Sequence, residues 1–75
     1  MDKFLVITKY NDASSEANAA KGFFKHWKNQ VVSENPYAVI ISAHSIRELT
    51  DELNVSDIEC TVTQLGRTVH RHAAA

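Results

Sequence analysis

The sequence predicts a small two-layer sandwich of the α/β or α+β class, a β-α-β-α-β sheet with two helices on one face. Two short runs rich in β-branched and aromatic residues, at 4–8 and 37–42, are typical of strands. A long helical pattern of apolar residues separates these runs, and a shorter one follows residue 45. Consecutive right-handed crossovers would place both helices on the same side of the sheet, which gives two layers.

The chain is short for a protein that must bury its own core. Its 75 residues make one domain, and a domain of this size buries only about 60% of the surface that its unfolded chain exposes. We place the domain at 1–72, because the alanines at 73–75 belong to no pattern and resemble a cloning remnant. With one cysteine, and therefore no internal disulfide, such a chain is expected to gain burial from a partner or from a second copy of itself.

Both predicted strands are apolar on their two faces. In "FLVIT", at 4–8, the side chains of Phe4, Val6 and Thr8 point to one side and those of Leu5 and Ile7 to the other. The second run, "YAVIIS" at 37–42, likewise has apolar residues at both parities. This pattern is typical of central strands that are covered on both sides. The sequence does not determine which parity faces the helices.

The first helix is predicted from the strongest periodic signal in the chain. Three residues suited to an N-cap precede it, namely Asn11, Asp12 and Ser14. Apolar residues then recur at helical spacings of four and three, at Ala13, Ala17, Ala20, Phe24, Trp27 and Val31. We expect this helix to end before Pro36, since a residue that precedes proline is disfavoured in the α region.

A second, shorter helix is predicted after residue 45. Ser45 and Glu48 have the spacing of a capping box at its start. Its apolar stripe consists of Ile46, Leu49 and Leu53, at spacings of three and four. We expect it to end near Asn54, a residue type that tolerates the left-handed conformation at a helix C-terminus.

Two interpretations compete for the segment from 57 to 70. In the helical one, the segment completes a helix-turn-helix with a stripe of Ile58, Val62, Leu65 and Val69. In the other, a strand with Cys60 among its inward residues turns at Gly66 and returns at 67–71 as a second strand. We favour the strands, because β-branched residues are frequent here and Gly66 would stand inside the alternative helix. Carboxylates at the start of a recognition helix would also repel DNA phosphates.

Two helices can cover only one face of the predicted sheet. Since both strands are apolar on both sides, a second apolar face remains. We expect that face either to be covered by terminal segments, or simply to expose a little apolar surface, or to be an interface with a partner or with a second copy of the chain, as in a homodimer.

Basic residues supply the candidate partner-binding positions. Lys21, Lys25 and Lys28 lie at i, i+4 and i+7 and would form a stripe along the predicted first helix, with aromatic residues between them. Arg67 and Arg71 would extend this stripe if the last strand lies beside that helix. Such a surface can contact nucleic acid or an acidic partner. The alternative is the solvated flank of an ordinary amphipathic helix.

The sequence contains no catalytic or metal-binding motif. His70 and His72 would share one face of a strand, but no further ligands stand at zinc-site spacing. Cys60 falls among apolar neighbours, as a structural cysteine does. Two glycines in the whole chain are too few for a glycine-rich phosphate loop. We therefore expect no enzymatic activity, no cofactor and no metal.

Charge and composition narrow the expected function further. The formal net charge of −1 provides no general basic field, and the apolar run near the N-terminus is too short to span a membrane. The lone cysteine fits the reducing cytoplasm. We expect a small cytoplasmic module that regulates or inhibits a partner, in the first place a protein, as accessory proteins of phages and mobile elements such as anti-CRISPR proteins do. The alternative is a nucleic-acid-binding regulator that uses the lysine stripe or a helix-turn-helix at 45–70.

Overall fold

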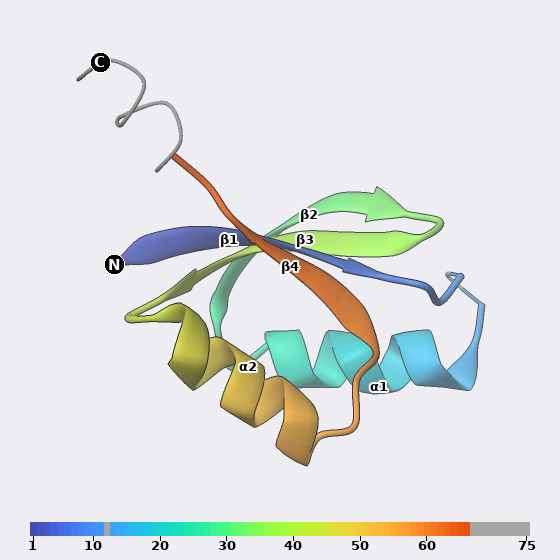
Figure 1. Ribbon diagram of the computed structural model, residues 1–75. Coiled ribbons are helices and arrows are strands. Elements are labelled where there is room, and N and C mark those ends of the chain that lie inside the picture. Colours follow the sequence, from blue (N-terminus) through green and yellow to red (C-terminus); the bar gives the residue numbers. More distant parts are fainter. Residues whose placement is uncertain (12, 67–75) are drawn as a thin grey trace.

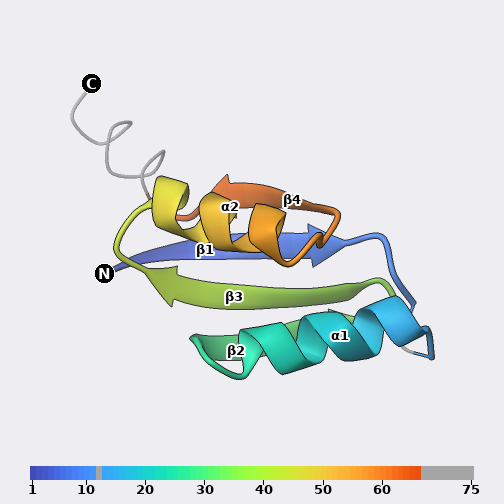
Figure 2. The same ribbon diagram turned by 90° about the horizontal axis from the view of Figure 1, so that it is seen from below.

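Both helices lie on one face of a four-stranded antiparallel sheet (Figure 1). The computed structural model describes residues 1–11 and 13–66. Seen from below, both helices lie in front of the sheet, which confirms the predicted two-layer α+β architecture (Figure 2). In chain order the elements are β1 (Asp2–Thr8), α1 (Ser15–Phe24), β2 (Lys28–Glu34), β3 (Tyr37–Ala43), α2 (Ile46–Val55) and β4 (Cys60–Gln64).

The chain forms two interlocked β-α-β units. The strands lie in the order β2-β3-β1-β4, and all neighbouring pairs are antiparallel. The unit β1-α1-β2 therefore encloses β3 between its two strands, and the unit β3-α2-β4 encloses β1. This is the split β-α-β connectivity of ferredoxin-like folds. Folds of this kind carry many unrelated functions, so the function has to be argued from the surface.

The first helix is shorter than the sequence predicts. It begins as expected, with the Ser14 hydroxyl accepting a hydrogen bond from the backbone N–H of Ala17 at 3.0 Å. It ends at Phe24, well before Pro36. The side-chain amide of Asn29 donates hydrogen bonds to the carbonyl oxygens of Phe24 (2.7 Å) and Trp27 (2.9 Å). These bonds satisfy carbonyl groups that a continuing helix would have used, and the chain leaves the helix.

The residues expected to complete that helix form β2, which the sequence analysis missed. β2 pairs with β3 along its length, with a register shift between Val31 and Ser33. Asn35 and Pro36, joined by a cis peptide bond, connect the two strands. Val31, the last residue of the predicted helical stripe, lies opposite Val39 in this hairpin and is 48% exposed. Pairing with β3 thus overrides the local helical pattern.

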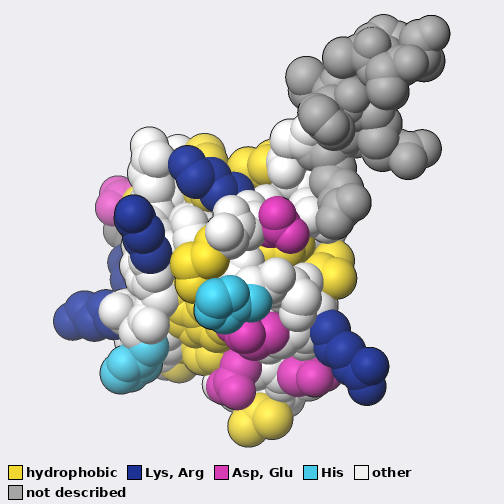
Figure 3. Space-filling model, turned by 90° about the vertical axis from the view of Figure 1, so that its left-hand side faces the viewer, with side chains coloured by type: hydrophobic (Ala, Val, Ile, Leu, Met, Phe, Trp, Pro, Cys, Tyr) yellow, Lys and Arg dark blue, Asp and Glu magenta, His cyan; other side chains and the backbone are white. Residues whose placement is uncertain are grey.

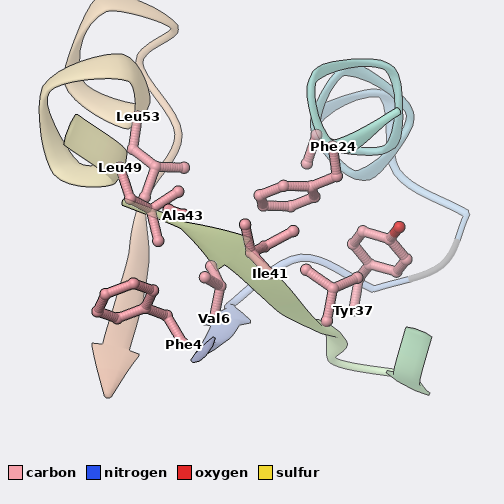
Figure 4. Close-up of a cluster of buried hydrophobic side chains, with 10 residues drawn as sticks. Phe4, Val6, Phe24, Tyr37, Ile41, Ala43, Leu49 and Leu53 are labelled. Atoms are coloured by element: carbon pink, nitrogen blue, oxygen red, sulfur yellow. The ribbon is translucent and has the colours of Figure 1, made fainter. Parts of the chain in front are cut away.

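The hydrophobic core fills the space between the sheet and the two helices. Figure 4 shows Phe24 of α1 and Leu49 of α2 directed toward β3, around Ile41 and Ala43. In the two central strands, the side chains that face the helices include those of Phe4, Val6 and Ile41, which are fully buried. The sheet contributes Phe4, Val6, Tyr37, Val39, Ile41 and Ala43, and the helices contribute Ala20, Phe24, Leu49 and Leu53.

The second helix begins and packs largely as predicted. The Ser45 hydroxyl accepts a hydrogen bond from the backbone N–H of Glu48 at 3.1 Å, which confirms the N-cap. Leu49 and Leu53 are buried, but Ile46, in the same predicted stripe, is 45% exposed. Ile46 is the first residue of α2.

The end of α2 is a Schellman motif centred on Asp57. The N–H of Ile58 bonds to the carbonyl of Leu53 (3.1 Å), and the N–H of Asp57 bonds to that of Asn54 (3.1 Å). Asp57 has a φ of 56°, in the left-handed region that glycine adopts most easily. The sequence analysis assigned this conformation to Asn54, which is instead helical. The turn lies three residues further along the chain.

Replacing Asp57 with glycine is therefore expected to stabilise the protein by about 0.5–1 kcal/mol, because glycine removes the steric cost of the left-handed conformation. Asn54→Gly is the matched control and should instead destabilise by roughly a few tenths of a kcal/mol, since Asn54 lies within the helix. Urea unfolding followed by circular dichroism measures both changes as shifts of the midpoint at an unchanged slope. Stabilisation by Asn54→Gly and not by Asp57→Gly would contradict the described turn.

The segment after this turn is a strand, as favoured by the sequence. β4 pairs antiparallel with β1, which excludes a helix-turn-helix formed by a helix at 58–69. Cys60 and Val62 are half-buried against the core, whereas Thr61 and Thr63 are exposed. Gly66 has a φ of 85°, consistent with the predicted turn. The predicted returning strand at 67–71 and the alanines at 73–75 lie outside the described residues.

Candidate functional site

The face of the sheet that points away from both helices is the candidate site, and we call it the open face. Residues that alternate with the core residues form it, so all four strands contribute. Neither described helix crosses it, as the view in Figure 1 shows. Its residues are Lys3, Leu5 and Ile7 of β1, Ala38, Ile40 and Ser42 of β3, Lys28 and Gln30 of β2, and Thr61 and Thr63 of β4.

The centre of the open face is apolar. Leu5 lies directly opposite Ile40, and Ile7 opposite Ala38, across the β1-β3 pair. Ile7 is 39% exposed, Leu5 and Ile40 are half-buried, and Ala38 is buried between its larger neighbours. We call these four residues the apolar centre. It is the second apolar face that the sequence predicts, and the described helices leave it uncovered.

Polar side chains border the apolar centre on two sides. Thr61 and Thr63 flank it on β4, in register with Ile7 and Leu5. Gln30 flanks it on β2, in register with Ile40. An apolar centre with a polar rim is the usual composition of a protein–protein interface.

One end of the open face is basic. Ser42 lies between Lys3 on β1 and Lys28 on β2, in register with both, and we call these three residues the basic row. The basic row opens into a hollow of about 180 Å³ that is also lined by Asn29, Gln30 and Ile40. Within residues 1–11 and 13–66, neither lysine forms an ion pair with an acidic side chain. Two ammonium groups therefore stand beside an apolar surface.

Acidic residues gather on the opposite side of the molecule. Glu48, Asp51 and Glu52 are exposed on α2. In the side view of Figure 3, acidic side chains (magenta) gather in the lower half, on the helix side, where a basic side chain (dark blue) also stands, and both basic and acidic side chains lie nearer the top. The acidic cluster on α2 therefore lies on the helix side of the sheet, opposite the basic row.

The lysine stripe predicted on the first helix does not exist as such. Lys21 lies in the last turn of α1, with its Nζ 5.3 Å from the centre of the Tyr37 ring, and Lys25 is the exposed C-cap residue. Lys28 belongs to β2 and points to the open face. The shortened helix thus separates the three lysines. Arg67 and Arg71 lie outside the described residues.

Lys3 was not among the predicted site residues, although its position in the strand offered a signal. Lys3, Leu5 and Ile7 are each two residues apart, so their side chains share one face of the strand. Its neighbour Lys28 could not be found in this way, because the segment around Lys28 was assigned to a helix. Only the pairing of three strands brings Lys3, Ser42 and Lys28 together.

Cys60 and the described histidines show no arrangement for chemistry. Cys60 is half-buried on the helix side of β4, and burial raises the pKa of its thiol, which lowers the fraction of reactive thiolate. His26 and His44 are both exposed, and His70 and His72 lie outside the described residues. Within the part of the chain that the structure describes, no three His, Cys, Asp or Glu side chains form a group that could hold a metal ion.

The two described helices are ten residues each, and neither has the length or the hydropathy to cross a membrane. Comparisons with protein-family models, with curated proteins and with solved structures give no match to this chain.

Proposed function

We propose that this protein is a cytoplasmic, non-enzymatic binding module that regulates or inhibits another protein by docking it on the open face. The observation that carries the proposal is the apolar centre, which the described helices leave uncovered on the opposite side of the sheet. Contiguous apolar surface of this kind, rimmed by polar residues, is typical of interaction sites.

Composition favours a protein partner over nucleic acid. Sheet surfaces that bind single-stranded RNA or DNA stack bases on aromatic side chains. The open face carries Leu5, Ile7 and Ile40 where such a surface would carry aromatic rings. Among the described residues, Tyr10, Phe23 and Trp27 pack instead against the core. Two lysines alone would provide a weak, salt-sensitive contact with phosphates.

The size of the open face favours a short segment of a partner over a second copy of this chain. Three strands of seven residues and one of five, at about 3.3 Å per residue and spaced by about 4.8 Å, give a face of roughly 410 Å². A stable interface of ordinary size buries about 800 Å² on each partner. A homodimer through this face alone would therefore be weak. One extended segment of a partner needs less area, and a four-stranded face is wide enough to contact it along its length.

Substitution of Ile7 by glutamate is expected to reduce partner capture at least tenfold, because it places a charge in the apolar centre. Tagged full-length protein would be incubated with lysate of the organism that carries the gene, and captured proteins quantified by isotope-labelled mass spectrometry. Val55→Glu is the matched control, since Val55 is 83% exposed on α2 and lies outside the open face. It should leave capture within about twofold of the unsubstituted protein.

A second open-face variant guards against loss of folding. Thr61→Arg adds bulk beside Ile7 from an exposed position of β4, where the strand itself tolerates the change. Thermal unfolding of each variant is measured in parallel. If folded Ile7→Glu and folded Thr61→Arg both retain the full set of captured proteins, the open face is not the docking surface.

A further inference from the structure

We infer that the partner segment places a carboxylate on the basic row, next to an apolar side chain on the apolar centre. The inference rests on the proposed docking function and specifies the chemistry of the docked protein. Charge complementarity carries it, because two lysines without described acidic partners face a hollow at the border of an apolar surface.

The geometry of the basic row suits a single carboxylate. Lys3 and Lys28 stand on either side of Ser42, two strand spacings or about 10 Å apart along the sheet. Their flexible stems allow both ammonium groups to reach an anion above Ser42. The Ser42 hydroxyl and the Gln30 amide line the same hollow and can donate hydrogen bonds to carboxylate oxygens. The donors thus converge from three strands.

The basic row and the apolar centre follow one another along the strands, and this succession predicts the order of residues in the partner segment. Along β1 the face presents Lys3, then Leu5, then Ile7, at intervals of about 6.6 Å. An extended segment also repeats its side chains on one face every second residue, at nearly the same interval. A segment lying along the strands would therefore present an acidic residue, then an apolar residue two positions away, then another apolar residue two positions further. Either chain direction satisfies this pattern.

The expected partner is thus an acidic and apolar segment of a protein rather than a phosphorylated or nucleic-acid ligand. Recognition of phosphate commonly uses the planar fork of arginine. Among the described residues, the arginine is Arg47, which lies on α2, away from the open face. Lysines beside aliphatic side chains suit a partner segment in which an acidic residue stands next to apolar residues.

A random 12-residue peptide library on phage, selected on the full-length protein, tests the inference without knowledge of the natural partner. We expect enriched peptides to carry Asp or Glu two positions from an aliphatic residue. One such peptide is then synthesised, together with a version in which the acid is replaced by its amide. Binding of both is measured by fluorescence anisotropy to the unsubstituted protein and to the double variant Lys3→Gln/Lys28→Gln.

The double variant should bind the acidic peptide about tenfold more weakly, whereas the amide peptide should bind both proteins with similar affinity. Lys25→Gln is the matched control, since Lys25 is an exposed lysine at the end of α1, and it should change affinity less than twofold. The difference between the two peptides should shrink at high salt, because the lysines remain partly exposed to solvent.

The other outcomes separate this inference from the docking function. Peptides without acidic residues that bind through Ile7 but not through the lysines would overturn the inference and leave the docking function standing. No enriched peptide, or peptides whose binding is unaffected by Ile7→Glu and Thr61→Arg, would overturn both. A 12-nucleotide single-stranded RNA that binds more tightly than any peptide, and is lost in the double lysine variant, would assign the face to nucleic acid.

Discussion

Replacing Phe24 with alanine is expected to lower the free energy of unfolding by about 3–5 kcal/mol. The Phe24 ring is 1% exposed, and its centre lies 5.1 Å from that of Phe23 and 6.1 Å from that of Tyr37. Because it fills the space between the end of α1 and β3, its removal leaves a cavity that the short helix cannot close. A chain of this length has a total stability of only about 4–11 kcal/mol. The variant should therefore be close to unfolding.

Urea unfolding of Phe24→Ala and Phe23→Ala, followed by circular dichroism, measures this effect against a neighbour of the same chemistry. Phe23 is half-buried, so its truncation should cost less than half as much. Equal losses for the two variants would mean that α1 is rotated relative to the described structure.

The end of α1 shows where prediction from sequence failed. Trp27 and Val31 continue the helical spacing of the earlier residues, so the pattern alone favours one long helix. Two contacts end the helix at Phe24. The side-chain amide of Asn29 donates hydrogen bonds to carbonyl groups at the end of α1, and β2 pairs with β3. Neither contact leaves a periodic trace in the sequence. The same error placed Lys28 on a helix and produced the lysine stripe.

The strands and α2 could be predicted because their signals are local. β1, β3 and β4 follow from short runs of β-branched residues, and the Ser45 cap follows from its spacing to Glu48. The two-layer arrangement follows from two predicted helices joined to the strands by consecutive right-handed crossovers. Which parity meets the helices depends on the packing of Phe24 and Leu49, which are distant in sequence, and so only the structure determines it.

The candidate site was predictable in kind but not in its residues. Strands that are apolar at both parities predicted a second apolar face, and the structure shows that the described helices leave it open. The basic row could not be predicted, since it joins one residue from each of three strands, one of which was missed. Sites assembled across a sheet depend on strand order, and strand order is set by non-local pairing.

Leu49 supplies the second large expected effect. Its side chain has no exposed surface and lies between α2 and the sheet, near Ala43 (Figure 4). Leu49→Ala is expected to lower the free energy of unfolding by about 2–5 kcal/mol, because it removes buried methyl groups and leaves a cavity. Ile46 belongs to the same predicted stripe but is 45% exposed, so Ile46→Ala should cost less than about 1 kcal/mol.

Thermal unfolding separates the two, since each kcal/mol corresponds to about 4–8 °C for a domain of this size. Leu49→Ala should melt at least about 8 °C below the unsubstituted protein, and Ile46→Ala within a few degrees of it.

Binding of an open-face peptide provides a second test of the Leu49 variant. Because Leu49 faces the opposite side of the sheet from the apolar centre, folded Leu49→Ala at low temperature should bind an open-face peptide with unchanged affinity. A loss of affinity while the variant remains folded would show that the docking surface extends to α2, on the side of the molecule opposite the open face.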